Sequence, residues 1–85
     1  MIIKNETGIK TRMSVKEAIK WLNELKKTKY IVMQTNLWNP YVIRTIVYNQ
    51  NKDTTPEIYW LEGLTKNTES MLLTVANEKK YGRFW

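Results

Sequence analysis

Residues 14–27 read SVKEAIKWLNELKK, and this stretch predicts the element from which the rest of the fold can be built. Ser14 followed three residues later by Glu17 forms a capping box, in which each side chain accepts a hydrogen bond from the other residue's backbone N–H. The apolar residues that recur at helical spacing are Val15, Ala18, Ile19, Leu22 and Leu25. The pattern predicts a helix from about Val15 to Lys27, with one apolar face that packs on another element.

Three segments that follow this helix have the composition of β-strands, because they are rich in β-branched and aromatic residues. They are residues 30–35, 41–49 and 57–61. Turn-forming residues between the first two, and the polar stretch 49–56 before the third, favour adjacent antiparallel strands. The sequence therefore predicts a three-stranded antiparallel sheet after the helix.

The predicted fold class is α+β, in a single small domain that spans residues 1–85. Its order is a helix, a three-stranded antiparallel sheet and a C-terminal helix over residues 67–80, with the helices on one face of the sheet. A strand over residues 70–76 is the alternative to that second helix, because the segment also contains β-prone residues. A short hairpin of residues 2–4 and 9–13 could precede the first helix.

The predicted order of helix, three strands and helix, over residues 14–80, resembles that of double-stranded-RNA-binding domains. That family carries a basic cluster at the start of its second helix, which the resemblance would place at residues 65–69. This chain has only one lysine there, Lys66, together with Glu69. The resemblance is therefore one of element order, and the chain is not assigned to the family.

The composition favours binding over catalysis. The chain has 14 lysines and arginines, four tryptophans and five tyrosines, but no histidine and no cysteine. It thus lacks the usual base for a nucleophile and the usual ligands of zinc. Asp53 and the glutamates show no spacing typical of a calcium loop. We therefore expect a non-enzymatic protein with no metal and no other cofactor. An enzyme that used glutamate or lysine would need a substrate-sized pocket lined by both.

The hydropathy pattern contains no apolar run long enough to cross a bilayer, and the first residues lack the apolar stretch of a signal peptide. The absence of cysteine also gives no sign of an oxidising compartment. We therefore expect a cytoplasmic protein with no membrane partner.

Positive charge is concentrated toward the ends of the chain, which carries a net charge of +6. Lys16, Lys20 and Lys27 fall on one face of the predicted helix. The candidate nucleic-acid-binding residues are Lys10, Arg12, Lys16, Lys20, Lys27 and Lys29. Lysines of this kind would contact phosphates without reading bases. The alternative is that they form the solvated outer face of an amphipathic helix.

A second candidate surface combines arginine with aromatic side chains. Arg44 is the only strong charge inside the predicted strand 41–49, so the face that it shares with Tyr48 is expected to be the solvated one. Trp38 falls in the tight connection before that strand, where a large apolar side chain is hard to bury, and tryptophan is frequent at interface hot spots. The candidate partner-binding residues are Trp38, Arg44, Tyr48, Arg83, Phe84 and Trp85.

Each of these residues also has a structural interpretation. Arg44 could pair with a cross-strand glutamate, and Tyr48 could pack against a neighbouring strand. Trp38 and the aromatic tail could fold back on the core, and Trp21 and Trp60 are assigned to the core or its edge.

Two functions are consistent with these features. The first is a small binding protein that contacts the nucleic-acid backbone through its N-terminal basic region. The alternative is a protein-binding inhibitor or adaptor of the type encoded by phages and mobile elements, which would act stoichiometrically on a host protein. The sequence leaves the identity of the partner and the oligomeric state open.

Overall fold

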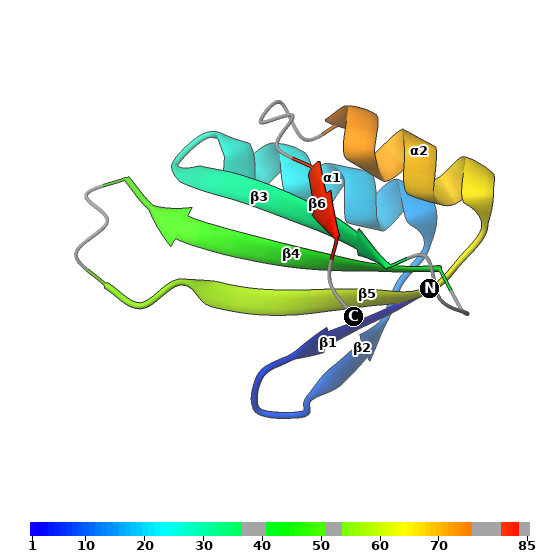
Figure 1. The fold of residues 1–85 in the computed structure, drawn as a ribbon, viewed down its shortest axis with the longest axis horizontal. Coiled ribbons are helices and arrows are strands. Elements are labelled where there is room, and N and C mark those ends of the chain that lie inside the picture. Colours follow the sequence, from blue (N-terminus) through cyan, green and yellow to red (C-terminus); the bar gives the residue numbers. More distant parts are fainter. Residues whose placement is uncertain (37–40, 51–53, 76–80, 84–85) are drawn as a thin grey trace.

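The computed structural model describes residues 1–36, 41–50, 54–75 and 81–83, and shows a curved sheet with two helices (Figure 1). The elements in chain order are β1 (Ile2–Asn5), β2 (Lys10–Arg12), α1 (Val15–Lys26), β3 (Lys29–Asn36), β4 (Tyr41–Asn49), β5 (Glu57–Leu64), α2 (Lys66–Val75) and β6 (Tyr81–Arg83). Within these residues one sheet forms, in the strand order β2-β1-β5-β4-β3-β6. Strands β1 to β5 pair antiparallel with their neighbours, and β6 runs parallel to β3 at the edge.

The prediction of a helix followed by a three-stranded sheet was wrong, because the sheet begins before the helix and extends beyond the three predicted strands. β1 pairs antiparallel with β5, with Ile3 opposite Leu61, and β2 extends the sheet past β1. At the other edge, β6 pairs with β3. A short strand carries no local sign of a partner that lies far along the chain, so the sequence predicts the hairpin only as a separate unit. The added strands also depart from the element order of double-stranded-RNA-binding domains.

Helix α1 begins at the predicted capping box and confirms that prediction. Ser14 Oγ accepts from the backbone N–H of Glu17, and Glu17 Oε1 accepts from the backbone N–H of Ser14, both at 3.2 Å. Ala18 and Leu22 are fully buried on the inner side of the helix. The helix ends at Lys26, one residue before the predicted boundary.

The C-terminal segment forms a helix, α2, and not the alternative strand. Its first turn is capped by Thr65, whose hydroxyl accepts from the backbone N–H of Thr68 at 3.2 Å. At its other end, Lys26 of α1 donates a hydrogen bond to the carbonyl oxygen of Val75. The last part of the predicted helix, residues 76–80, lies outside the described residues.

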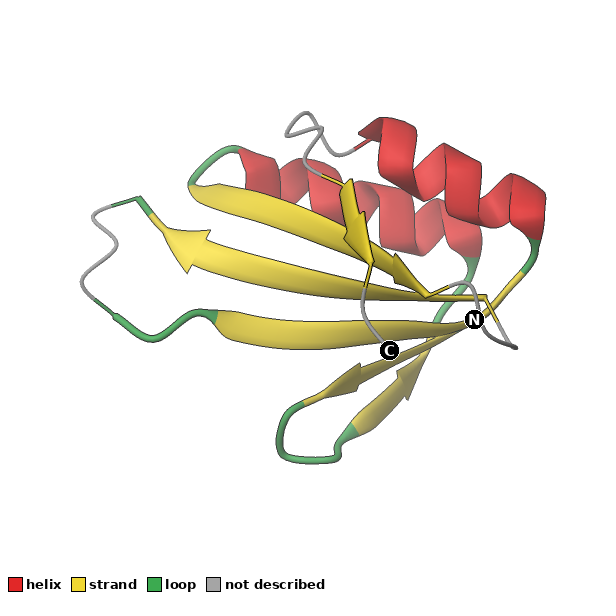
Figure 2. Cartoon of the chain, in the orientation of Figure 1, coloured by secondary structure: helices red, strands yellow, loops and turns green. Residues whose placement is uncertain are grey.

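Both helices pack on the same face of the sheet (Figure 2). Buried side chains of α1 and α2 form one core with inward residues of the strands. Along β4 the residues Ile43, Thr45 and Val47 are buried while those between them are only half-buried, because side chains alternate between the two faces of a strand. In the described part of the chain, no helix or strand covers the opposite face. That face, called the open face below, is the one on which β4 carries Arg44 and Tyr48, as predicted.

Candidate binding surface on the open face of the sheet

The open face consists of the alternate strand residues whose neighbours point into the core. Strand register and the burial pattern identify them across five adjacent strands. They are Lys10 and Arg12 of β2, Ile2 and Lys4 of β1, Ile58, Trp60 and Glu62 of β5, Val42, Arg44, Ile46 and Tyr48 of β4, and Tyr30, Val32 and Gln34 of β3. The surface is therefore apolar and aromatic in its middle and carries cations on several strands.

One row of residues, called the central row below, crosses this face from strand to strand. Its members in strand order are Lys10, Lys4, Trp60, Arg44 and Gln34, each paired in register with the next. Strands lie about 4.8 Å apart, so the row spans roughly 19 Å. The indole of Trp60 thus lies between a lysine and an arginine, each on a directly adjacent strand.

Two cations lie side by side at one end of the central row. Lys4 is half-buried and Lys10 is exposed, and their Cα atoms are paired across β1 and β2. Like charges directly opposite each other in a sheet are destabilising. An anion bound between the two ammonium groups would remove that repulsion.

Gln34 holds the guanidinium of Arg44 in place. Arg44 Nε donates to Gln34 Oε1 at 2.6 Å, and Nη2 donates to the same oxygen. A neutral amide on the adjacent strand thus contacts the guanidinium of Arg44. The amide orients the guanidinium, whose planar N–H groups match the geometry of a phosphate.

A pair of tyrosines marks another part of the open face. The rings of Tyr30 and Tyr48 pack across β3 and β4, with centroids 6.0 Å apart and planes inclined at 55°. The cross-strand packing proposed for Tyr48 is thus present. An apolar row of Ile58, Ile46 and Val32 separates this pair from the central row.

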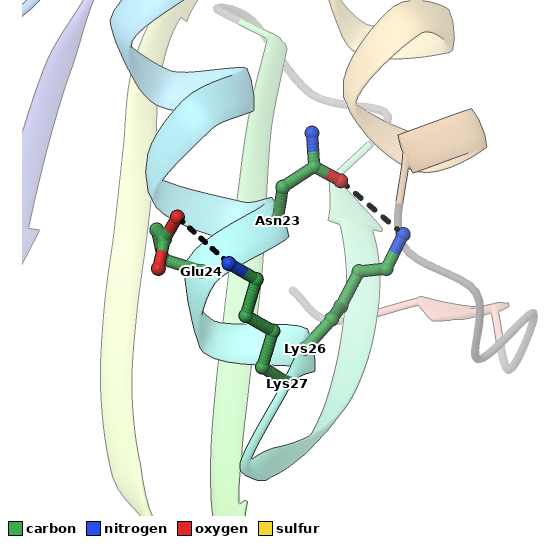
Figure 3. Close-up of polar contacts among 4 residues, drawn as sticks. All are labelled: Asn23, Glu24, Lys26 and Lys27. Carbon is green, nitrogen blue, oxygen red and sulfur yellow. Dashed lines mark hydrogen bonds and ion pairs between the residues drawn. The ribbon is translucent and has the colours of Figure 1, made fainter.

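The lysines of α1 lie on the other side of the molecule, because the inner side of that helix packs on the covered face of the sheet. Lys16 and Lys20 are exposed on its outer side. Lys27 Nζ forms an ion pair with Glu24 Oε1 at 3.2 Å (Figure 3). An exposed pair of this kind contributes only about 0–1 kcal/mol to stability, yet it offsets part of the local positive charge.

The structure therefore separates the predicted nucleic-acid-binding residues into three places. Lys10 and Arg12 lie on the open face at its β2 edge, while Lys16 and Lys20 of α1 and the C-cap residue Lys27 lie on the other side of the molecule. Lys29, at the start of β3, donates a hydrogen bond to Asn49 Oδ1 on β4.

The predicted partner-binding residues are also divided. Arg44 and Tyr48 share the open face. Arg83 belongs to the edge strand β6. Trp38, Phe84 and Trp85 lie outside the described residues.

Sequence reasoning overlooked Lys4 and assigned Trp60 to the core or its edge. On β5 the neighbours Tyr59 and Leu61 pack in the core, which places Trp60 on the open face. The alternation along β5 was visible in the sequence, but its inward side depends on pairing with β1. By contrast, Trp21 does lie at the core edge, where its ring meets that of Tyr59 edge-on at 5.2 Å.

Two hollows on the described surface are open to solvent, and neither resembles an enclosed catalytic site. One of about 410 Å³ lies between the β1–β2 turn and the start of β5, and no lysine or arginine lines it. Within it the Tyr59 hydroxyl donates to Glu57 Oε2 at 2.6 Å, and this bond, with burial, raises the pKa of Tyr59 to about 12. The other, of about 510 Å³, is lined by α1 and its N-cap alone, and one helix cannot enclose a substrate.

Among the described residues, no group of three or more histidine, cysteine, aspartate or glutamate side chains could hold a metal ion. None of the helices in the described ranges has the length and apolarity needed to span a membrane. Comparison of the chain with protein-family models, curated proteins and solved structures gives no match. Function must therefore be argued from the surface itself.

Proposed function

We propose that this chain is a small non-enzymatic binding protein that contacts the phosphate backbone of nucleic acid through the open face. The central row carries the proposal, because it places Lys10, Lys4 and Arg44 on one face that no described element covers. Arg12 adds a fourth cation, and Glu62 is the only carboxylate among the described open-face residues. A concentrated positive field of this kind attracts polyanions and gains free energy when counterions are released.

The outer side of α1 is the less favourable surface for a polyanion. Its exposed lysines, Lys16 and Lys20, alternate with Glu17 and Glu24, and the charge of Lys27 is partly offset by its ion pair. The proposal thus keeps nucleic acid as the partner and moves the contact from the N-terminal helix to the sheet.

The test compares two double variants with the same change in charge. Lys4→Glu/Lys10→Glu alters the open face, and Lys16→Glu/Lys20→Glu alters the outer side of α1. Binding of a fluorescent oligonucleotide would be measured by anisotropy at several salt concentrations, after circular dichroism has shown that both variants fold. We expect the sheet variant to lose most of its affinity and the helix variant to keep most of it.

Two results would contradict this proposal in different ways. Loss of affinity in the helix variant alone would move the interface to α1. A wild-type chain that binds no nucleic acid even at low salt would exclude the function itself, since phosphate contacts are strongest there.

A protein partner is the second candidate function, and the apolar row of Val32, Ile46 and Ile58 favours it. These side chains are half-buried on a face without a described cover, beside two tyrosines. An inhibitor or adaptor would form a complex that survives nuclease treatment and moderate salt. That complex should be lost in Ile46→Asp and kept in Lys16→Glu/Lys20→Glu.

A further inference from the structure

We infer that the nucleic acid bound on the open face is a single strand, and that one of its bases stacks on the indole of Trp60. The inference rests on the proposed function and specifies its ligand. It is carried by the position of Trp60 within the central row, between Lys4 and Arg44.

The shape of the surface argues against a paired duplex. Base edges of a duplex are read by a helix or a β-ribbon inserted into a groove. The open face is a sheet surface, and in the described part of the chain no helix rises from it. A duplex lying on this face would offer phosphates to the cations but no base plane to Trp60.

The arrangement of the central row matches the alternation of base and phosphate along an unpaired strand. Lys4 and Arg44 flank Trp60 on adjacent strands, at Cβ separations of about 5 Å. A base stacked on the half-buried indole would thus have a cation within reach of the phosphate on either side. Stacking on an aromatic ring tolerates any base, because every base has a π-face.

The tyrosine pair supplies a second aromatic surface at a distance that suits the same strand. Tyr48 lies four residues from Arg44 along β4, which corresponds to about 13 Å. Its ring and that of Tyr30 lie on the same face as Trp60. A strand crossing the open face obliquely would therefore meet aromatic rings at two places, with Arg44 between them.

The test measures affinity for an unstructured single strand of about 12 nucleotides, such as oligo(dT), and for a duplex of the same length. Trp60→Ala should weaken single-strand binding by roughly 5- to 150-fold, the loss expected for one stacked base, and should change duplex binding by less than about twofold. Trp60→Phe should restore most of the affinity. The slope of log K against log salt should stay the same in Trp60→Ala, because a stacked ring releases no counterions.

Tryptophan fluorescence provides a second measurement that a purely structural role would leave unchanged. Oligo(dT) should quench the wild-type emission, and Trp60→Phe should remove much of that quenching. Trp21→Phe is the matched control, since its indole lies on the covered side of the sheet against Tyr59. Quenching and affinity should both persist in the control.

The outcomes separate this inference from the proposed function. Equal affinity of the wild type for duplex and single strand, or an unchanged single-strand affinity in a folded Trp60→Ala, would overturn the inference and leave the function standing. An equal loss for both ligands in Trp60→Ala would also overturn it. If the wild type bound neither the single strand nor the duplex, both the inference and the proposed function would be contradicted.

Discussion

Lys26, in the last turn of α1, donates a hydrogen bond to the carbonyl oxygen of Val75, the last residue of α2. The final carbonyls of a helix have no partner within the helix and carry its partial negative charge. One side chain therefore satisfies an end of α2 and joins the two helices that cover the sheet.

Replacement of Lys26 should test this link, with its neighbour as a matched control. Lys26→Met keeps most of the aliphatic stem but removes the charged donor, and should lower the free energy of unfolding by about 1 kcal/mol. Lys27→Met removes only an exposed ion pair and should cost about 0–1 kcal/mol, at the lower end of that range. Chemical denaturation of both variants measures the difference, and an equal effect would contradict the role of Lys26.

The capping box predicts both a stability loss and a pH dependence. Ser14→Ala should destabilise the protein by about 1 kcal/mol, because the N–H of Glu17 loses its acceptor. Ser70→Ala, the same change at an exposed position inside α2, should be neutral or slightly stabilising.

The pH dependence follows from Glu17, whose pKa is lowered by the backbone N–H and then by the side chain of Ser14. Its carboxylate is favoured by folding, so this contribution is present above the unfolded pKa and is lost as the pH falls through the lower, folded pKa. Denaturation curves from neutral to acid pH should show that Glu17→Gln, which has no carboxylate to protonate, loses stability less steeply on acidification than the wild type. Parallel pH profiles would be evidence against the box.

Glu69 of α2 should behave in the opposite way. Its Oε2 is buried and has no hydrogen-bond partner among the described residues, and burial raises the pKa of this carboxyl although Lys66 lowers it. The Glu69 carboxyl therefore ionises at lower pH in the unfolded chain than in the folded one, so stability falls as the pH rises through its folded pKa. Glu69→Gln should therefore stabilise the protein at neutral pH, and the gain should shrink in acid.

Urea denaturation at neutral and acid pH measures that gain, with Glu6→Gln in the exposed β1–β2 turn as the control. A Glu69→Gln variant less stable than the wild type at neutral pH would mean that the ionised carboxylate has a partner that outweighs its burial.

The parts of the fold that sequence reasoning predicted are those decided by neighbouring residues. The capping box at Ser14 and the apolar spacing that follows it define α1 locally, and the solvated side of β4 could be inferred because Arg44 lies on it. The pairing of β1 with β5 depends instead on Ile3 and Leu61, which lie 58 residues apart in the chain. No local pattern specifies such a contact, so the predicted extent of the sheet was wrong.

The prediction of the candidate site also depended on which strands pair. Arg44 and Tyr48 were selected because one strand was enough to place them together. Trp60 and Lys4 become neighbours only when β1 lies beside β5, and the sequence offered no reason to connect them. The helical spacing of Lys16 and Lys20 is a local pattern, and it carries no information on which side of the sheet that helix packs.

The position of β1 between β2 and β5 also bears on how the chain folds. Pairing of residues 2–5 with 59–62 closes a loop that contains α1, β3 and β4. Such distant pairing slows folding, because the conformational entropy of the loop is lost before the contacts between the strands can form. Until that pairing forms, β5 has an unpaired edge that could accept a strand from another copy of the chain. By pairing with that edge of β5, β1 protects it from intermolecular strand pairing.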